Sequence, residues 1–179
     1  VVLVKTKDGK EGDVKVTYDG TVSMKIATYT QKVLSSEWYA RLSNEAAFNE
    51  NPNAEMPYSD EEIEMFRNGS NPDMYPNTNW YDEILHTALT HNHSLDISGG
   101  TEKATYSVGT SYLYQDGILD SKNDYSRFNL RTKADYKAFD WLKVGANVVL
   151  SNSTQNLPNG EVWLAAFRTP GIIPVYDEN

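Results

Sequence analysis

The strongest pattern in the chain is an alternation of apolar and polar side chains over residues 125–137. Even positions there carry apolar or small side chains, such as Phe128 and Leu130, whereas odd positions carry Arg127, Arg131 and other polar residues. Successive side chains of a β-strand point to opposite faces of its sheet. The period of two therefore predicts a strand with one apolar face and one charged face.

The same alternation returns in other stretches, which are separated by connections of very different length. The predicted strands span residues 13–26, 91–98, 104–115, 125–137 and 142–151. The connections at 99–103 and 139–141 are short, whereas those at 27–88, at 116–124 and from 154 onward are longer. We therefore predict an antiparallel up-and-down meander with its short connections at one end and its longer ones at the other.

The long connection at 27–88 carries helix signals of its own. The apolar residues within 36–48 have helical spacing. Ser59, followed three residues later by Glu62, is a predicted capping box that begins a second helix, and Gly69 ends it. Loops of this size inside compact domains are usually functional.

Composition narrows the classes of partner and scaffold. The chain of 179 residues has a net charge of −9 and a pI of about 4.8. An acidic chain argues against nucleic acid as a partner, because phosphate binding needs a basic surface. The sequence has no cysteine, which excludes a disulfide scaffold and a thiolate metal site. Its 12 tyrosines suit amphipathic strands better than a thick helical core.

Two architectures fit the pattern. A charged strand face is costly in a packed core but stable against a water-filled lumen, and a membrane β-strand needs only about 9–11 residues. Five strands cannot close a membrane barrel, so under this hypothesis we expect the chain to lie inside a larger protein. The alternative is a secreted β-sandwich with one wet face, which binds carbohydrate or another protein through the insertion at 27–88.

Several motifs, in chain order, resemble one family. VVLVKTKDGKEG at 1–12 is similar to the end of the plug domain of SusC/RagA-type TonB-dependent outer-membrane transporters. NPDMYPNTNW at 71–80 and HNHSLDISGGTEKATY at 91–106 resemble the stretch before the second barrel strand and the hairpin that follows. YSRFNLR, within 112–131, and DWLKVG at 140–145 resemble the next hairpin and turn.

The resemblance implies a mainly β fold: an antiparallel up-and-down meander forming part of a transmembrane β-barrel, with short helices in a long loop. Residues 1–12 would end the plug domain, and residues 13–179 would form the N-terminal part of the barrel. The implied function is import of bulky nutrients such as oligosaccharides across the outer membrane of a Gram-negative bacterium, without enzymatic activity or a cofactor. The implied partners are TonB (through a part outside this chain), a SusD-like surface lipoprotein, outer-membrane lipid, and a glycan or peptide substrate.

Two groups of residues are candidates for binding. Aromatic residues in the predicted loops could stack on a ligand, contact a partner protein or simply pack within the loop: Trp38, Trp80, Tyr81 and Trp163. Polar residues of the 125–137 strand are predicted to face the lumen or to pair with acidic residues of the plug: Arg127, Arg131, Lys133 and Asp135.

Other polar clusters have simpler explanations. His91 and His93 share one strand face, but a metal site needs a third ligand and a second shell, and the sequence shows neither. The acidic residues at 60–64 fit the first turn of a helix, where negative charge is favourable without any catalytic role. We therefore predict no catalytic residue and no metal site.

Overall fold

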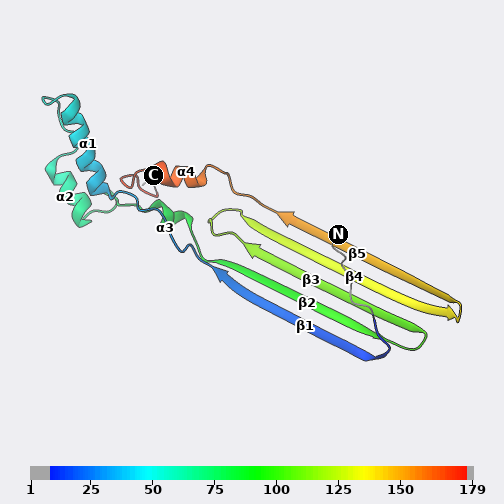
Figure 1. Cartoon of the computed structure of the whole chain (residues 1–179). Helices are drawn as coiled ribbons and strands as arrows, with labels where there is room; N and C mark the ends of the chain where they lie inside the picture. Colours follow the sequence, from blue (N-terminus) through cyan, green and yellow to red (C-terminus); the bar gives the residue numbers. More distant parts are fainter. Residues whose placement is uncertain (1–8, 177–179) are drawn as a thin grey trace. The chain divides into compact units, whose positions relative to one another are not determined.

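The computed structural model of the chain describes residues 9–176 (Figure 1). These residues form two compact units, which we call the sheet unit and the loop unit. The sheet unit comprises the chain up to Ile26, Thr87–Ile118 and Lys122–Leu157. The loop unit comprises Ala27–His86, Leu119–Ser121 and the chain from Pro158. Residues 1–8, which carry most of the predicted end of the plug domain, lie outside the described residues.

The sheet unit is one antiparallel sheet of five strands in the order β1-β2-β3-β4-β5, which confirms the predicted meander (Figure 1). The strands are β1 (Gly12–Lys25), β2 (Ala88–Gly100), β3 (Ala104–Asp116), β4 (Asp124–Phe139) and β5 (Leu142–Gln155). Two predicted boundaries were wrong: β2 begins before His91, and β5 runs on to Gln155. Both extensions arise because backbone pairing with the neighbouring strand continues after the side-chain alternation has faded.

Side chains of the five strands form continuous rows across each face. One row of the apolar face contains Val16, Ile97, Val108, Thr132 and Val148. The adjacent row of the polar face contains Thr17, Asp96, Gly109, Arg131 and Val149. Among the described residues every strand belongs to this one sheet, and Phe128 and Tyr136 of the apolar face remain exposed. A β-sandwich would bury that face under a second sheet, so the fold favours the barrel interpretation.

Two glycines of the polar face lie directly opposite an aspartate of a neighbouring strand: Gly109 faces Asp96, and Gly145 faces Asp135. A Cβ atom at Gly109 would lie 2.7 Å from Oδ1 of Asp96, and one at Gly145 would lie 2.5 Å from Oδ1 of Asp135. Each carboxylate therefore occupies the space that a side chain on the next strand would need. These two acidic groups lie flat along the sheet.

The loop unit contains four helices: α1 (Ser36–Glu50), α2 (Asp60–Asn68), α3 (Trp80–Ile84) and α4 (Val162–Arg168) (Figure 1). Its small core consists of Ala40, Ile63 and Phe66, against which Tyr58, Tyr75 and Ile172 pack. The predicted helices α1 and α2 are confirmed, whereas α3 and α4 were not predicted. Within residues 9–176, no helix combines the length and the apolar character needed to cross a bilayer.

Val148 and Val149 offer a matched test of the two sheet faces. They are adjacent in β5, are 49% and 59% exposed, and belong to the apolar and the polar face respectively. In the full-length protein we expect Val148→Arg to cost about 2–4 kcal/mol of stability, because a charge on the lipid face is costly near the bilayer midplane. Val149→Arg should cost far less, because its side chain reaches water. Urea unfolding of each variant in detergent micelles measures the difference, and equal losses would contradict the assignment of the faces.

Candidate functional site

The four charged candidates of β4 all project from the polar face of the sheet. Arg127 Nε donates a hydrogen bond to Asn129 Oδ1 at 3.0 Å, and Lys133 Nζ lies 3.9 Å from Asp135 Oδ2. Arg131 lies between Gly109 on β3 and Val149 on β5. The strand therefore presents a row of mostly cationic groups.

Asn129 links three strands on this face. Its Nδ2 donates to Ser111 Oγ of β3 at 3.1 Å, and Ser151 Oγ of β5 donates to its Oδ1 at 2.9 Å. In the sequence, Asn129 is only one of the polar positions of the alternation over residues 125–137. Its bridging role depends on the register between strands, which the sequence of one strand does not reveal.

A cavity of about 520 Å³ lies on the polar face beside the residues that precede β1. Lys10 and Glu11 line it together with polar-face residues of the first three strands: Asp13, Lys15, Thr17, Asp19, Asp96, Ser98 and Ser107. Just before them, a Cβ atom on Gly9 would lie 2.7 Å from the backbone nitrogen of Tyr106, so only glycine fits this close approach. Residues 9–11, which precede β1, therefore lie against the sheet, and Lys10 and Glu11 lie on its polar face.

The four aromatic candidates lie in the connections between strands, and each belongs to a helix of the loop unit. Trp38 is in α1, Trp80 and Tyr81 are in α3, and Trp163 is in α4. Helix α3 is a single turn capped by Asn79, and the VWLAAFR sequence of α4 is apolar almost all around. Neither helix has an amphipathic period, which explains why the sequence pattern did not reveal them.

The structure divides the aromatic candidates into structural and accessible residues. Tyr81 is buried, and its ring packs on Trp163 with the ring centroids 6.1 Å apart. Trp80 Nε1 donates to the backbone oxygen of Pro170 at 3.3 Å. Trp38 and Trp163 remain exposed, so these two keep a surface that a ligand or partner protein can reach.

Three separate connections of the sheet combine to build the loop unit. Thr78, in the connection after β1, donates two hydrogen bonds to the connection after β5. Its backbone nitrogen donates to the Gly171 oxygen and its Oγ1 to the Ile173 oxygen, both at 2.9 Å. The connection after β3 joins the connection after β1 through a hydrogen bond of 2.8 Å from the Asp120 nitrogen to the Ile84 oxygen. The connections that follow β1, β3 and β5 therefore fold as one body.

His91 and His93 form part of an aromatic cluster on the apolar face. His93 Nδ1 and the Tyr18 hydroxyl are 2.7 Å apart, and the His91 and His93 rings lie 5.2 Å apart between centroids. Tyr112 and Tyr114 complete the cluster beside His91. Among residues 9–176 there is no group of three or more His, Asp or Glu side chains placed to hold a metal ion.

The chain is similar over all its length to TonB-dependent receptor P26 of Formosa agariphila, with 30% identity over 17% of that protein. It is also 28% identical to TonB-dependent receptor SusC of Bacteroides thetaiotaomicron, over 85% of this chain and 14% of that one. No family model matches the chain. In a structure of the RagAB peptide importer in the "closed-closed" state, one chain superposes with a TM-score of 0.65 and 19% identity, covering 87% of this chain and 19% of that one.

This chain is similar to a segment of the SusC/RagA-type TonB-dependent transporters. The likeness confirms the predicted resemblance and the predicted fold class, a meander that forms part of a transmembrane β-barrel. It also confirms the predicted location, the outer membrane of a Gram-negative bacterium. The chain spans less than one fifth of the length of the relatives that it matches, 17% of the first and 14% of the second.

The acidic start of α2 is a helix cap. Ser59 Oγ accepts a hydrogen bond from the Glu62 nitrogen at 3.2 Å, and Glu62 Oε2 accepts one from the Ser59 nitrogen at 2.8 Å. The backbone N–H and then the hydroxyl of Ser59 lower the pKa of Glu62. Because this pKa is lower in the folded state, Glu62 stabilises α2 above its ordinary pKa of 4.5, and the effect is lost as the pH falls through the lowered value.

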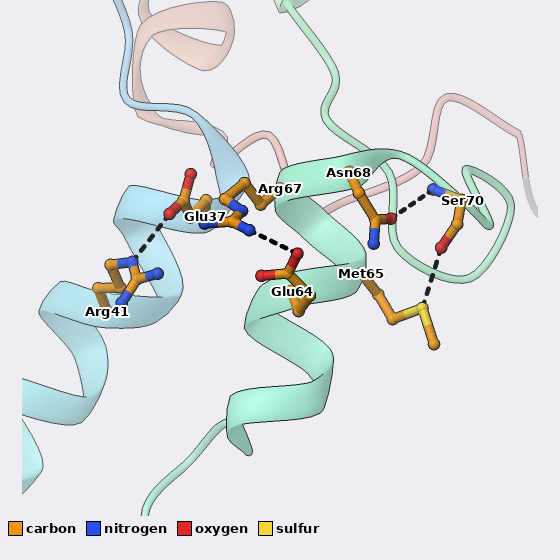
Figure 2. A network of polar contacts seen from close by, with 7 residues as sticks. All are labelled: Glu37, Arg41, Glu64, Met65, Arg67, Asn68 and Ser70. Carbon is orange, nitrogen blue, oxygen red and sulfur yellow. Dashed lines mark hydrogen bonds and ion pairs between the residues drawn. The ribbon is translucent and has the colours of Figure 1, made fainter.

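The cap gives a local test of the loop unit. In the full-length protein we expect Ser59→Ala to destabilise α2 by about 1 kcal/mol at neutral pH, because the helix loses its N-cap acceptor. Hydrogen exchange of the α2 amides measures the loss. Ser70→Ala is the control, because Ser70 lies beyond the end of α2 and, among the described residues, its hydroxyl donates only to Met65 Sδ, at 3.0 Å (Figure 2). Equal exchange in both variants would contradict the role of the cap.

A second test addresses the junction between the first and third connections. A Cβ atom at Gly171 would lie 2.8 Å from the Thr78 oxygen and 3.2 Å from Ser36 Oγ, whereas one at Gly160 would meet nothing within 4 Å. We expect Gly171→Val to separate the two connections, because overpacking typically costs about 1–3 kcal/mol. Trypsin should then cleave the full-length Gly171→Val protein after Arg168 faster than it cleaves the wild type or Gly160→Val there. Identical cleavage of the two variants would show that the junction does not hold the unit together.

Proposed function

We propose that this chain forms part of the wall and the outer mouth of a transporter that imports bulky nutrients, such as oligosaccharides or peptides, across the outer membrane. The observation that carries the proposal is the five-stranded meander with an exposed apolar face and a charged opposite face. Such a sheet needs lipid on one side and water on the other. The helical loop unit adds the surface with which a mouth selects its substrate.

We assign the interior of the barrel to the polar face, with Arg127, Arg131, Lys133 and Asp135 lining it. Residues 9–11 support this assignment, because Gly9 lies against the backbone of Tyr106 and the next two residues line a polar-face cavity. A plug domain that fills the barrel would have to join β1 from this side. Residues 1–12 then form the end of the plug, and residues 13–179 begin the barrel.

The proposed partners follow from the two ends and two faces of such a barrel. Outer-membrane lipid contacts the apolar face, TonB supplies energy through a region outside this chain, and a SusD-like surface lipoprotein covers the mouth. Trp38 and Trp163 are the aromatic candidates that we assign to contacts with the partner or the substrate, because they remain exposed. Trp80 and Tyr81 support them from within the loop unit.

The proposed activity is transport without catalysis, so the substrate should enter the cell unchanged. Its test is uptake of labelled oligosaccharides and oligopeptides by cells that produce the full-length protein. We expect uptake to require the protein, to stop when a protonophore collapses the proton-motive force, and to deliver substrate of unchanged mass to the periplasm. Uptake of a small porin substrate serves as the control, because it needs neither this protein nor the proton-motive force.

Energy-independent uptake of the bulky substrate would argue against a TonB-dependent role. Recovery of cleaved substrate from purified full-length protein would instead point to an enzyme. Either result would overturn the proposal.

A further inference from the structure

Three adjacent hollows of the loop unit surround the irregular segment at residues 29–35, between β1 and α1. The first has a volume of about 510 Å³, and four of its eight lining residues are aromatic. Two cations line the second, of about 330 Å³, and the third, also of about 330 Å³, is lined by amides and hydroxyls together with Lys32, Val33 and Leu34. Phe167 borders the first and second hollows, while Gln31 borders the first and third. We call the three together the segment groove.

The first hollow offers flat apolar rings to solvent. Tyr29, Trp163 and Phe167 line it and are 80%, 42% and 54% exposed. Exposed aromatic rings that border a cavity are typical of binding sites rather than of a core. No charged residue lines this hollow, so it suits a neutral ring with apolar C–H faces, such as a pyranose.

The second hollow carries cations that the protein leaves unpaired. Lys32 and Arg168 line it, and within residues 9–176 neither side chain has an ion-pair or hydrogen-bond partner. The other two arginines of the loop unit are each paired within their own helix, Arg41 with Glu37 at 2.9 Å and Arg67 with Glu64 at 2.7 Å (Figure 2). In a chain of net charge −9, two unpaired cations beside one cavity favour an anionic ligand.

The border with the third hollow supplies neutral hydrogen-bonding groups. Thr30 and Gln31 line both the first and the third hollow, and neither side chain bonds to another residue in the described part of the chain. A side-chain amide and a hydroxyl can donate to and accept from sugar hydroxyls. Apolar rings, neutral polar groups and cations thus follow one another along the segment groove.

We propose that the segment groove binds an acidic oligosaccharide, one that carries uronate carboxylates or sulfate esters. Its pyranose rings stack on the aromatic end, its hydroxyls bond Thr30 and Gln31, and its anionic groups reach Lys32 and Arg168. A neutral glycan would leave the two cations without a partner, and an extended acidic peptide offers no rigid ring for three exposed aromatics. This inference rests on the proposed transport function and specifies its substrate class.

The test measures binding of matched probes to purified full-length protein by calorimetry. The probes are trigalacturonate and its fully methyl-esterified form, together with a carrageenan tetrasaccharide and its desulfated form. We expect at least one charged probe to bind about tenfold tighter than its uncharged counterpart, the size of one or two charge-assisted hydrogen bonds. The comparison of probes needs no variant, so it does not depend on how a substitution affects folding.

Variants then identify the residues that give the preference for the charged probe. Lys32→Ala and Arg168→Ala should each reduce the advantage of the charged probe, whereas Phe167→Ala should weaken the charged and the uncharged probe alike. Arg67→Ala is the matched control, because it removes an exposed cation of the same unit that is already paired. It should keep the full preference.

Several outcomes would overturn the inference. These are equal affinity for charged and uncharged probes, no binding of either acidic oligosaccharide, equally tight binding of triglutamate, or an unchanged preference in both cation variants. Energy-dependent uptake of neutral glycans or peptides alongside any of these results would leave the transport proposal intact. The transport proposal itself would be contradicted by uptake that needs neither the protein nor the proton-motive force.

Discussion

The contrast between the two faces of each strand is the constraint on which the sheet depends. Side chains alternate between a face rich in valine, leucine and tyrosine and a face that carries arginine, lysine and aspartate. Backbone hydrogen bonds between neighbouring strands hold all five in one register. A register shift of one residue would send every charge to the apolar face. The strand register is therefore determined by which side chains must face water.

Because of this constraint, much of the fold could be predicted from the sequence. All five strands were found from alternation alone, and α2 from Ser59, Glu62 and Gly69, which form the observed capping box and left-handed end. Helix α3 could not be predicted, because it has one turn and no period. Helix α4 could not be predicted either, because its sequence is apolar almost all around.

The sequence revealed less of the candidate site. The polar-face residues of β4 were predicted, since they follow the same alternation as the strand. The segment groove was not, because Lys32 and Arg168 lie in different connections of the sheet, and neither stretch has a periodic pattern. Their proximity depends on hydrogen bonds such as the one from the Thr78 nitrogen to the Gly171 oxygen, which only the folded chain shows.

The composite origin of the loop unit has a consequence for the order of folding. The hydrogen bond from Thr78 Oγ1 to the Ile173 oxygen joins residues 95 positions apart. Contacts of such long range form late, because the intervening chain must first lose its freedom. Here the intervening chain is the four strands from β2 to β5, so hairpin pairing brings the first and third connections together. The loop unit is therefore completed only after the strands that connect its parts have paired.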